Sequence, residues 1–295
     1  MKRQPKIKTL GFFNVDKPSE VVSSAVVNKI KWLCGLPAGH MGTLDPLASG
    51  VLPVGVGNAT RLFNYFLEKR KTYLAEFTFG VDSDTLDSTG NLVYGGQVPN
   101  ETEIESALPA LLGEVLQIPP KYSAKNVNGK RGYELARAGI EFELAPKKVQ
   151  IYSVKLLGKG ERENSFRFEI ECGGGTYIRS IARDLAASLR TKAVMSGLRR
   201  TQSGVFRAEN AIPYEWFLRE EITPAELEEK IIPTDSVLPF AVLKVSEKER
   251  ERLLVGQTVP IGEEDGTYKF YNADGSFYGL AEAKGKRVKL VTKLC

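Results

Sequence analysis

The chain has 295 residues, of which 42% are hydrophobic and 26% are charged, and its net charge at neutral pH is +5. This is the composition of an ordinary soluble globular protein with room for about two domains. The three cysteines are distant from one another and lack a CxxC spacing, which argues against a disulfide framework and a structural zinc site. No apolar stretch is long enough for a membrane span. We therefore expect a cytoplasmic protein with no membrane contact.

The first half of the chain predicts strands and helices in alternation. Residues 23–35 have helical spacing, with a serine cap at the start and a glycine at the end. Residues 71–81 alternate apolar and polar side chains, which is typical of a strand with one buried face. Residues 100–113 begin with an asparagine three residues before a glutamate, an arrangement that starts helices. The remaining elements expected here are a strand over 8–18 and a helix over 59–70.

The second half begins with a polar, turn-rich segment, residues 117–148, which we expect to project from the core as a mobile arm. Residues 223–231 predict a short helix with a threonine cap and a proline at its first position. From about residue 235 onward, short strand-like pieces separated by Gly and Asp-Gly turns predict a small β-rich domain. Strands and helices are interleaved irregularly, which favours an α+β fold. The other expected elements are strands over 147–158 and 165–174 and a helix that follows three glycines and ends near 190.

Positive charge is concentrated in two stretches. Residues 121–148 carry seven basic and three acidic side chains, and residues 176–207 carry seven basic and one acidic, whereas residues 235–295 are nearly balanced. A single run of this kind is more often solvated surface. Two runs in one chain favour a polyphosphate partner such as a nucleic acid.

Several catalytic schemes do not fit the residues present. His40 is the only histidine, so a zinc hydrolase is disfavoured, and no GxSxG motif supports a Ser-His-Asp scheme. The triple glycine at 173–175 lacks the Gly-Lys-Ser/Thr of a phosphate loop, and it lacks the GxGxxG spacing as well. We therefore expect neither a metal nor a nucleotide cofactor.

One acidic stretch leaves a metal site open as an alternative. Asp82, Asp84 and Asp87 begin like a calcium loop, but the later ligand positions of that motif do not match. A two-metal nuclease built from these three residues and Asp45 is possible by composition. A tight turn made by the aspartates is the more common explanation of such a pattern.

Asp45 stands in an unusual setting, a loop that is rich in both glycine and apolar residues. The proline that follows it biases its backbone away from the helical region, and Gly42 and Gly50 permit close approach on either side. An ordinary turn aspartate is the default explanation. A partly buried carboxylate needs a partner, however, and Arg179 at the start of a predicted helix supplies one.

Two tyrosines add flat surfaces to this picture. Tyr73 lies on a predicted strand, and Tyr177 directly precedes the helix that carries the arginine. Either ring offers a face on which a base can stack, although core packing is the commoner role of a single aromatic residue.

Together these residues form a pattern that resembles a known family. The stretch "GHMGTLDPLASGVLPVGVGNATR" is similar to the signature of the TruB-type tRNA pseudouridine synthases. Four further blocks follow in that family's order: "KTYLAEFTFGVDSDTLDSTG", "IPPKYSAKNVNGKRGYELARAGI", "GGGTYIRSIARDL" and "SGLRRTQSG". The resemblance runs from about Asn14 to Gly204, and the tail resembles the PUA module, a small RNA-binding barrel. One departure is Glu20, where family members usually carry glycine; because it lies outside the signature, we expect it to matter little.

The resemblance implies a pseudouridine-synthase fold, a mixed and largely antiparallel sheet with flanking helices, over residues 1–234. A PUA-like domain over 235–295 would follow it. The family resemblance also implies the activity: an isomerase that converts the uridine at position 55 in the T loop of tRNA to pseudouridine. The enzyme would act as a monomer, without metal or cofactor. The basic arm at about 117–148 would grip the RNA, and the target base would be flipped out of its loop.

The resemblance also assigns roles by matching position. Asp45 would be the nucleophile, Arg179 its ion-pair partner, and Tyr73 the residue that stacks on the base and takes part in proton transfer. Substrate-binding roles would fall to Tyr73 again and to three further residues, His40, Tyr177 and Leu198. A non-catalytic RNA-binding or RNA-folding protein on the same scaffold remains the main rival hypothesis, and the metal-dependent nuclease is a more distant one.

Overall fold

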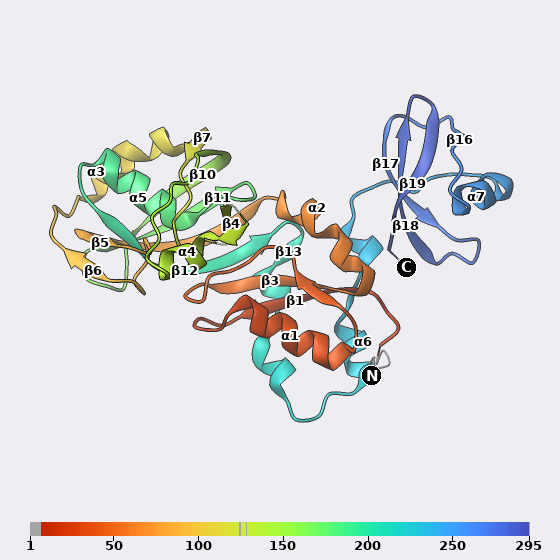
Figure 1. The fold of residues 1–295 in the computed structure, drawn as a ribbon, viewed down its shortest axis with the longest axis horizontal. Coiled ribbons are helices and arrows are strands. Elements are labelled where there is room, and N and C mark those ends of the chain that lie inside the picture. Colours follow the sequence, from red (N-terminus) through yellow and green to blue (C-terminus); the bar gives the residue numbers. More distant parts are fainter. Residues whose placement is uncertain (1–6, 124, 128, 295) are drawn as a thin grey trace.

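The computed structural model describes residues 7–123, 125–127 and 129–294. Within them it contains one large β-sheet, one small β-sheet and two two-stranded hairpins. The large sheet has eleven strands in the order β14-β1-β3-β12-β4-β11-β10-β7, with β2, β13 and β15 attached to its sides. The small sheet has four strands and forms a separate lobe at the C-terminal end (Figure 1). The α+β fold class is confirmed.

Most neighbouring strands of the large sheet run antiparallel. The exceptions are β1 with β14 and β12 with β3, which pair in parallel. The strands of this sheet are β1 (Gly11–Lys17), β2 (Ala38–His40), β3 (Ser49–Val56), β4 (Lys71–Phe79), β7 (Gly113–Gln117), β10 (Lys147–Lys159), β11 (Ser165–Cys172), β12 (Ala193–Ser203), β13 (Phe206–Arg207), β14 (Ile212–Pro213) and β15 (Ile232–Pro233). A separate hairpin joins β5 (Val81–Ser83) to β6 (Leu92–Tyr94).

The predicted alternation of β4 is confirmed: Tyr73, Ala75, Phe77 and Phe79 are buried, while Leu74 on the opposite face is exposed. This pattern arises because successive side chains of a strand point to opposite faces of the sheet. The apolar face packs against helices and forms the main core of the large lobe. The helices of the protein are α1 (Ser23–Cys34), α2 (Phe63–Leu67), α3 (Glu101–Ala107), α4 (Gly132–Arg137), α5 (Ile178–Ser188), α6 (Pro224–Lys230) and α7 (Glu247–Leu254).

Helix starts were predicted with mixed success. Asn100 and Thr223 cap α3 and α6 through capping boxes, as expected. The serine cap predicted for α1 is wrong, because Val22 occupies the cap position and makes no side-chain cap bond. The hydroxyl of Ser23 instead donates to the carbonyl of Leu44 at 2.7 Å and accepts from its amide at 3.0 Å. The serine therefore holds the loop that contains Asp45.

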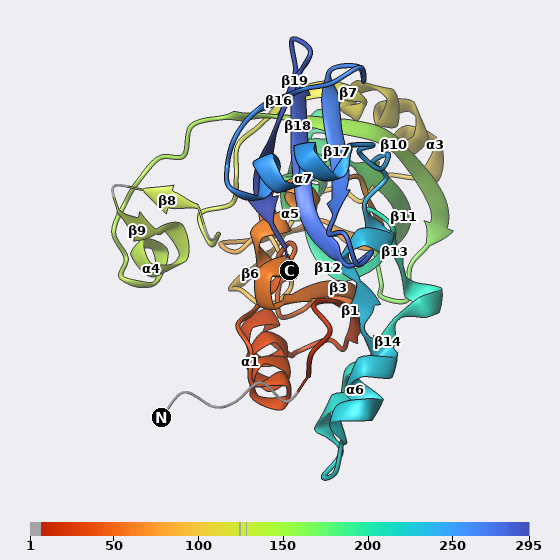
Figure 2. The same cartoon turned by 90° about the vertical axis from the view of Figure 1, so that its right-hand side faces the viewer.

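The predicted arm lies between the end of β7 and the start of β10. It contains a small hairpin, β8 (Asn126–Val127) and β9 (Lys130–Arg131), followed by α4. Figure 2 shows these elements standing out to one side of the large sheet. The projection is as expected, and the mobility of the arm stays a prediction.

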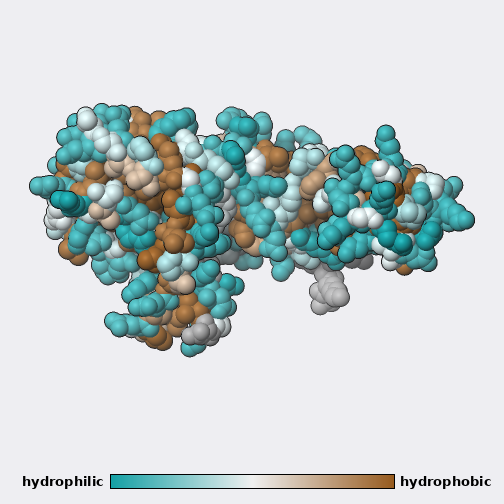
Figure 3. Space-filling model, turned by 90° about the horizontal axis from the view of Figure 1, so that it is seen from above, coloured by the Kyte–Doolittle hydropathy of each residue, from teal (hydrophilic) through white to brown (hydrophobic). Residues whose placement is uncertain are grey.

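The tail forms the small sheet, with strand order β16-β19-β18-β17, and packs around its own apolar core. The sequence patterns predicted only strands and turns here and missed α7, whose start is capped by Ser246. Gly256, one of the glycines expected to separate strands, follows this helix instead. Seen from above, both lobes have largely hydrophilic surfaces, with a band of apolar residues across the larger one (Figure 3). The strands of this sheet are β16 (Val259–Pro260), β17 (Gly266–Tyr271), β18 (Phe277–Lys284) and β19 (Arg287–Lys293).

The two lobes share an apolar cluster. Leu280 and Leu294 of the tail belong to the same buried group as Phe12, Val51 and Phe66 of the large lobe. A hydrogen bond of 2.8 Å from an Arg61 guanidinium nitrogen to the carbonyl of Lys293 adds to this contact. The boundary predicted after residue 234 stays a prediction. No helix among the described residues is long and apolar enough to cross a membrane.

The structure gives Gly50 a steric role that we can test. Gly50 has φ +101° and lies between β1 and β12, where an added Cβ would stand 2.2 Å from the carbonyl oxygen of Arg200. We expect Gly50→Ala to lower the free energy of unfolding by about 3 kcal/mol. The strain of an alanine at positive φ adds to the steric clash of its Cβ with the Arg200 carbonyl. Urea unfolding followed by circular dichroism measures this.

Gly113→Ala is the matched control, since Gly113 has φ +90° but no atom within 4 Å of its Cβ position. It carries the backbone strain alone and should cost about 1 kcal/mol. Equal losses in the two variants would contradict the role of close packing at Gly50.

Candidate active site

A cavity of about 210 Å³ lies where the Asp45 loop (residues 42–48) meets β4, β12 and the start of α5. Five of the six predicted site residues line it: Asp45, Tyr73, Tyr177, Arg179 and Leu198. They come from four separate segments of the chain, so the fold brings together what the sequence keeps apart. Other lining residues include Gly42, Thr43, Leu44, Leu67, Lys71, Ser123, Gly175, Thr176, Ile178, Met195 and Arg200.

The expected ion pair is present. The Nε of Arg179 lies 2.9 Å from Oδ2 of Asp45, and the arginine side chain is 5% exposed while the aspartate is 34% exposed. The two terminal nitrogens of the guanidinium donate to the carbonyls of Thr85 and Tyr122, each at 3.0 Å. Because a planar guanidinium held at all three nitrogens cannot rotate, it fixes the carboxylate in one orientation at the cavity wall.

A second carboxylate supports the same arginine. Oδ2 of Asp87 lies 3.6 Å from Nη1 of Arg179, and the Asp87 side chain is 8% exposed. Its other oxygen, Oδ1, accepts from the Thr85 hydroxyl and from the amide and hydroxyl of Thr89. The expected aspartate turn is therefore correct, but no sequence signal indicated that Asp87 also faces Arg179.

The Asp45 loop rests on the segment that precedes α1. The ammonium of the fully buried Lys17 donates to the carbonyls of Pro18 and Val21 at 2.8 and 2.7 Å, and it lies 3.4 Å from that of Pro46. The amide of Glu20 also donates to Pro46, at 2.7 Å, with Glu20 itself at φ +66°. Glu20 itself thus adopts a left-handed conformation, which suits glycine, the residue that family members usually carry there. The expectation that this departure matters little stays a prediction.

Two more buried cations lie under the cavity. Arg200 donates to the carbonyls of Val51 and Gly42 at 2.7 and 2.9 Å, and Lys71 donates to those of Leu67 and Lys69 at 2.8 and 2.7 Å. Burial, aided by the neighbouring Arg200 cation, lowers the pKa of Lys71 to about 8. These cations bind backbone carbonyls, so they fix loop ends, and both line the cavity and bring positive charge to its wall.

Tyr73 is almost completely buried in the cavity floor. Burial raises the pKa of Tyr73 to about 12, in spite of the opposing effect of Arg200. The phenol is consequently neutral at physiological pH. It offers a flat apolar face to a base and a hydroxyl that can exchange a proton with it.

Tyr177 is positioned through its backbone by Gln117, at the end of β7. The Tyr177 amide donates to Oε1 of Gln117 at 2.8 Å, and Nε2 of Gln117 donates to the Tyr177 carbonyl at 3.2 Å. Gln117 is 2% exposed, and no sequence signal marked it. Leu198 and Met195, both on β12, complete the apolar part of the wall.

His40 does not line the cavity. It ends β2, and its Nε2 lies 3.4 Å from the hydroxyl of Thr43, which does line the cavity. Burial lowers the pKa of His40, so the ring is neutral at pH 7. Its buried Nδ1 has no hydrogen-bond partner among the residues that the structure describes. The predicted contact of His40 with substrate stays a prediction.

The other acidic residues do not gather around the site. Asp82 pairs with Lys192 at 2.9 Å, and Asp84 accepts hydrogen bonds from Asn91. Within residues 7–123, 125–127 and 129–294, no group of three or more His, Cys, Asp or Glu side chains is arranged to hold a metal ion. The geometry gives no support to the nuclease alternative.

Comparison with known proteins identifies the family. Residues 32–178 match the TruB family pseudouridylate synthase (N terminal domain). The tRNA pseudouridine synthase B of Caldanaerobacter subterraneus subsp. tengcongensis is 37% identical to this chain. The match covers 95% of this chain and 97% of the relative. The chain belongs to the TruB family of pseudouridylate synthases. The corresponding protein of Clostridium acetobutylicum, 38% identical over 96% of this chain and 99% of its own length, agrees with this TruB assignment.

Solved structures support the fold of this TruB family member. It is similar to a chain of a Cbf5-Nop10-Gar1 complex, with a TM-score of 0.69 and 24% identity over 97% of this chain and 85% of that one. A chain of the archaeal box H/ACA sRNP Nop10-Cbf5 complex is also similar, with a TM-score of 0.67 and 23% identity. That match covers 100% of this chain and 89% of the other one. At these identities the likeness concerns the fold alone. The predicted pseudouridine-synthase fold and the isomerase activity class are confirmed.

A substitution at Asp87 tests whether this carboxylate helps to hold Arg179 in place. In Asp87→Asn the retained Oδ1 can still accept from Thr85 and Thr89, while an amide group replaces the oxygen that faces Arg179. We expect the single-turnover rate to fall about 10-fold, equivalent to about 1.4 kcal/mol, with RNA affinity within about two-fold. Rates measured with excess enzyme over radiolabelled RNA check this. Asp84→Asn, in the same loop but away from Arg179, is the control, and an equal effect there would contradict the assignment.

Lys71 provides a test of the buried cations. Its pKa of about 8 in the folded protein lies below the ordinary 10.5 of the unfolded chain, so between these values the unfolded state holds the extra proton. Stability should therefore rise with pH in this window relative to Lys71→Met, by about 2 kcal/mol between pH 8 and pH 10. Urea unfolding of both proteins at several pH values measures the difference. A constant difference would contradict the lowered pKa.

Proposed function

We propose that this protein converts the uridine at position 55 in the T loop of tRNA to pseudouridine, with Asp45 as nucleophile. One observation carries the proposal: Asp45, held at 2.9 Å by a buried Arg179, faces a small cavity whose floor is Tyr73. The cavity is smaller than the sites of drug-sized ligands, which suits a single base. Relatives that carry the name tRNA pseudouridine synthase B support tRNA as the substrate.

The reaction needs one nucleophile and no redox step. The bond from ribose C1′ to N1 of uracil breaks and a bond from C1′ to C5 forms, while C5 loses its proton and N1 takes up a proton, so the product is an isomer of the substrate. The carboxylate of Asp45 attacks C1′ or C6 and forms a covalent intermediate, which splits one difficult displacement into two easier steps. Arg179 orients the attacking oxygen, and Tyr73 stacks on the detached base near the departing proton.

The target base has to leave its loop before it can enter the cavity. Extrusion costs a few kcal/mol, which contacts to the RNA backbone must offset. The arm is suited to this task because it concentrates positive charge. Within residues 176–207, Arg179 and Arg200 are buried, so the exposed Arg190, Lys192 and Arg207 are the ones that can contact phosphates. In this proposal Tyr177 and Leu198 form the walls around the base, and His40 contacts the RNA at the entrance.

The remaining expectations belong to the same proposal. The enzyme acts as a monomer in the cytoplasm, without metal or nucleotide cofactor, and the PUA-like tail adds to RNA binding. The rival hypothesis of a non-catalytic RNA-binding protein predicts that Asp45 is dispensable. The convergence of Asp45, Arg179 and Tyr73 on one cavity favours the enzyme.

The decisive experiment is pseudouridine formation in an unmodified tRNA transcript, with wild type and Asp45→Asn compared in the presence of a chelator. We expect product at position 55 from the wild type and a loss of at least about 10³-fold in the variant, because the amide is not a nucleophile. Filter binding should give similar RNA affinities for both proteins. Equal binding without product from either protein would support the RNA-binding rival, and cleavage of the RNA that the chelator abolishes would support the nuclease.

A further inference from the structure

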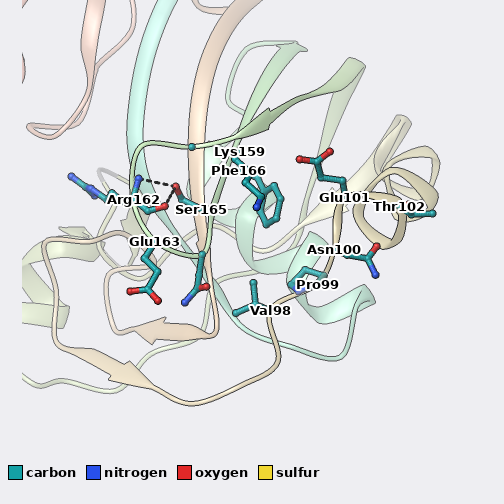
Figure 4. A pocket seen from close by; sticks show the side chains of 12 residues that line it. Val98, Pro99, Asn100, Glu101, Thr102, Lys159, Arg162, Glu163, Ser165 and Phe166 are labelled. Atoms are coloured by element: carbon teal, nitrogen blue, oxygen red, sulfur yellow. Dashed lines mark hydrogen bonds between the residues drawn. The ribbon is translucent and has the colours of Figure 1, made fainter.

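The turn between β10 and β11, residues 160–164, carries an arginine whose side chain leaves its own hairpin. Arg162 lies at the rim of a cavity of about 1090 Å³ between this turn and α3, and Figure 4 shows its guanidinium directed away from the other labelled residues. We propose that Arg162 is a positioning residue for the catalytic carboxylate, an inference that rests on the proposed role of Asp45. It acts through β12 and the Asp87 loop (residues 84–90).

The first contact is with an irregular point of β12. The register of β12 on β4 shifts between Met195 and Gly197, so Ser196 is the extra residue of a β-bulge. Nη1 of Arg162 donates to the carbonyl of Ser196 at 2.6 Å and lies 3.4 Å from the hydroxyl of Ser88. A cationic donor at this distance makes a strong hydrogen bond and satisfies a carbonyl that the bulge takes out of the ladder.

The preceding residue of β12, Met195, carries the effect to the Asp87 loop. The amide of Met195 donates to the carbonyl of Leu86, and the amide of Ser88 donates to the carbonyl of Met195, both at 3.1 Å. These two bonds hold the residues on either side of Asp87. Asp87 in turn lies 3.6 Å from Arg179, which lies 2.9 Å from Asp45.

The same bulge also shapes the wall of the cavity. Met195 and Leu198 flank the irregular region of β12, and both line the site that holds Asp45. A bulge that relaxed would move these side chains and the Asp87 loop together. Arg162 is therefore placed to affect the chemical step more than RNA binding.

The turn is held on its other side as well. The carboxylate of Glu76 on β4 lies 3.4 Å from the amides of both Glu161 and Arg162, and the amide of Arg162 also donates to Ser165 at 3.1 Å. The hydroxyl of Ser196 reaches the carbonyl of Glu76 at 3.3 Å. Since its backbone is anchored, Arg162 presents its guanidinium to the bulge at a fixed distance.

The test compares Arg162→Gln with Arg167→Gln. Arg167 lies on the same hairpin and donates to the carbonyl of Lys159, so its loss removes the same charge without touching the bulge. We expect Arg162→Gln to lower the single-turnover rate of pseudouridine formation about 3- to 10-fold, with the Kd for tRNA within about two-fold. Arg162→Lys, which keeps a cationic donor to Ser196, should recover most of the rate. Arg167→Gln should match the wild type.

Hydrogen exchange provides a second measurement that does not depend on activity. The amides of Met195 and Ser88 should exchange faster in Arg162→Gln, while those of β11 keep their wild-type rates. The inference would be overturned if Arg162→Gln left both the single-turnover rate and the amide exchange unchanged. It would also be overturned if Arg162→Gln and Arg167→Gln slowed the reaction equally. Either result would leave the proposed function standing. An inactive wild type would instead overturn the proposed function and this inference with it.

Discussion

The site depends on one buried guanidinium. Arg179 binds the Asp45 loop through Nε, the Asp87 loop through Nη1 and the base of the arm through Nη2. Three segments that are distant in sequence therefore meet at a single planar group, and each constrains the other two. A buried charge without partners is costly, so the folded state is favoured only when all three segments are in place. The requirement for a satisfied cation links the fold to the position of the Asp45 carboxylate.

The other buried cations extend this logic to the backbone. Lys17, Lys71 and Arg200 all donate to carbonyl oxygens, and two of these carbonyls, of Leu67 and Gly42, belong to residues that line the cavity. Turns leave backbone groups unpaired, and in the interior these groups need donors. Long cationic side chains supply several donors from one position, which lets irregular backbone be buried next to an active site.

Features of the fold that depend on local sequence were predictable. The alternation of β4, the capping boxes of α3 and α6 and the end of α1 at Gly35 all follow from residues within one element. The pairing of Asp45 with Arg179 was inferred because each residue stood out in its own setting and because the family resemblance joined them. The roles of Ser23, Asp87 and Gln117 were not predictable. Each depends on a contact across at least 21 residues, and a polar residue at a turn or strand end has a local explanation that is equally good.

The apolar cluster shared by the two lobes has a geometric consequence. Because Leu280 and Leu294 pack with Phe12 and Val51, rotation of the small sheet on the large one would expose buried apolar surface. Val51 follows the Asp45 loop on β3, so the cluster begins close to Asp45 in the chain. The distance from the base cavity to the outer face of the tail is then set by the protein itself. Under the proposed function, an RNA that contacts both the cavity and the tail has to span this distance.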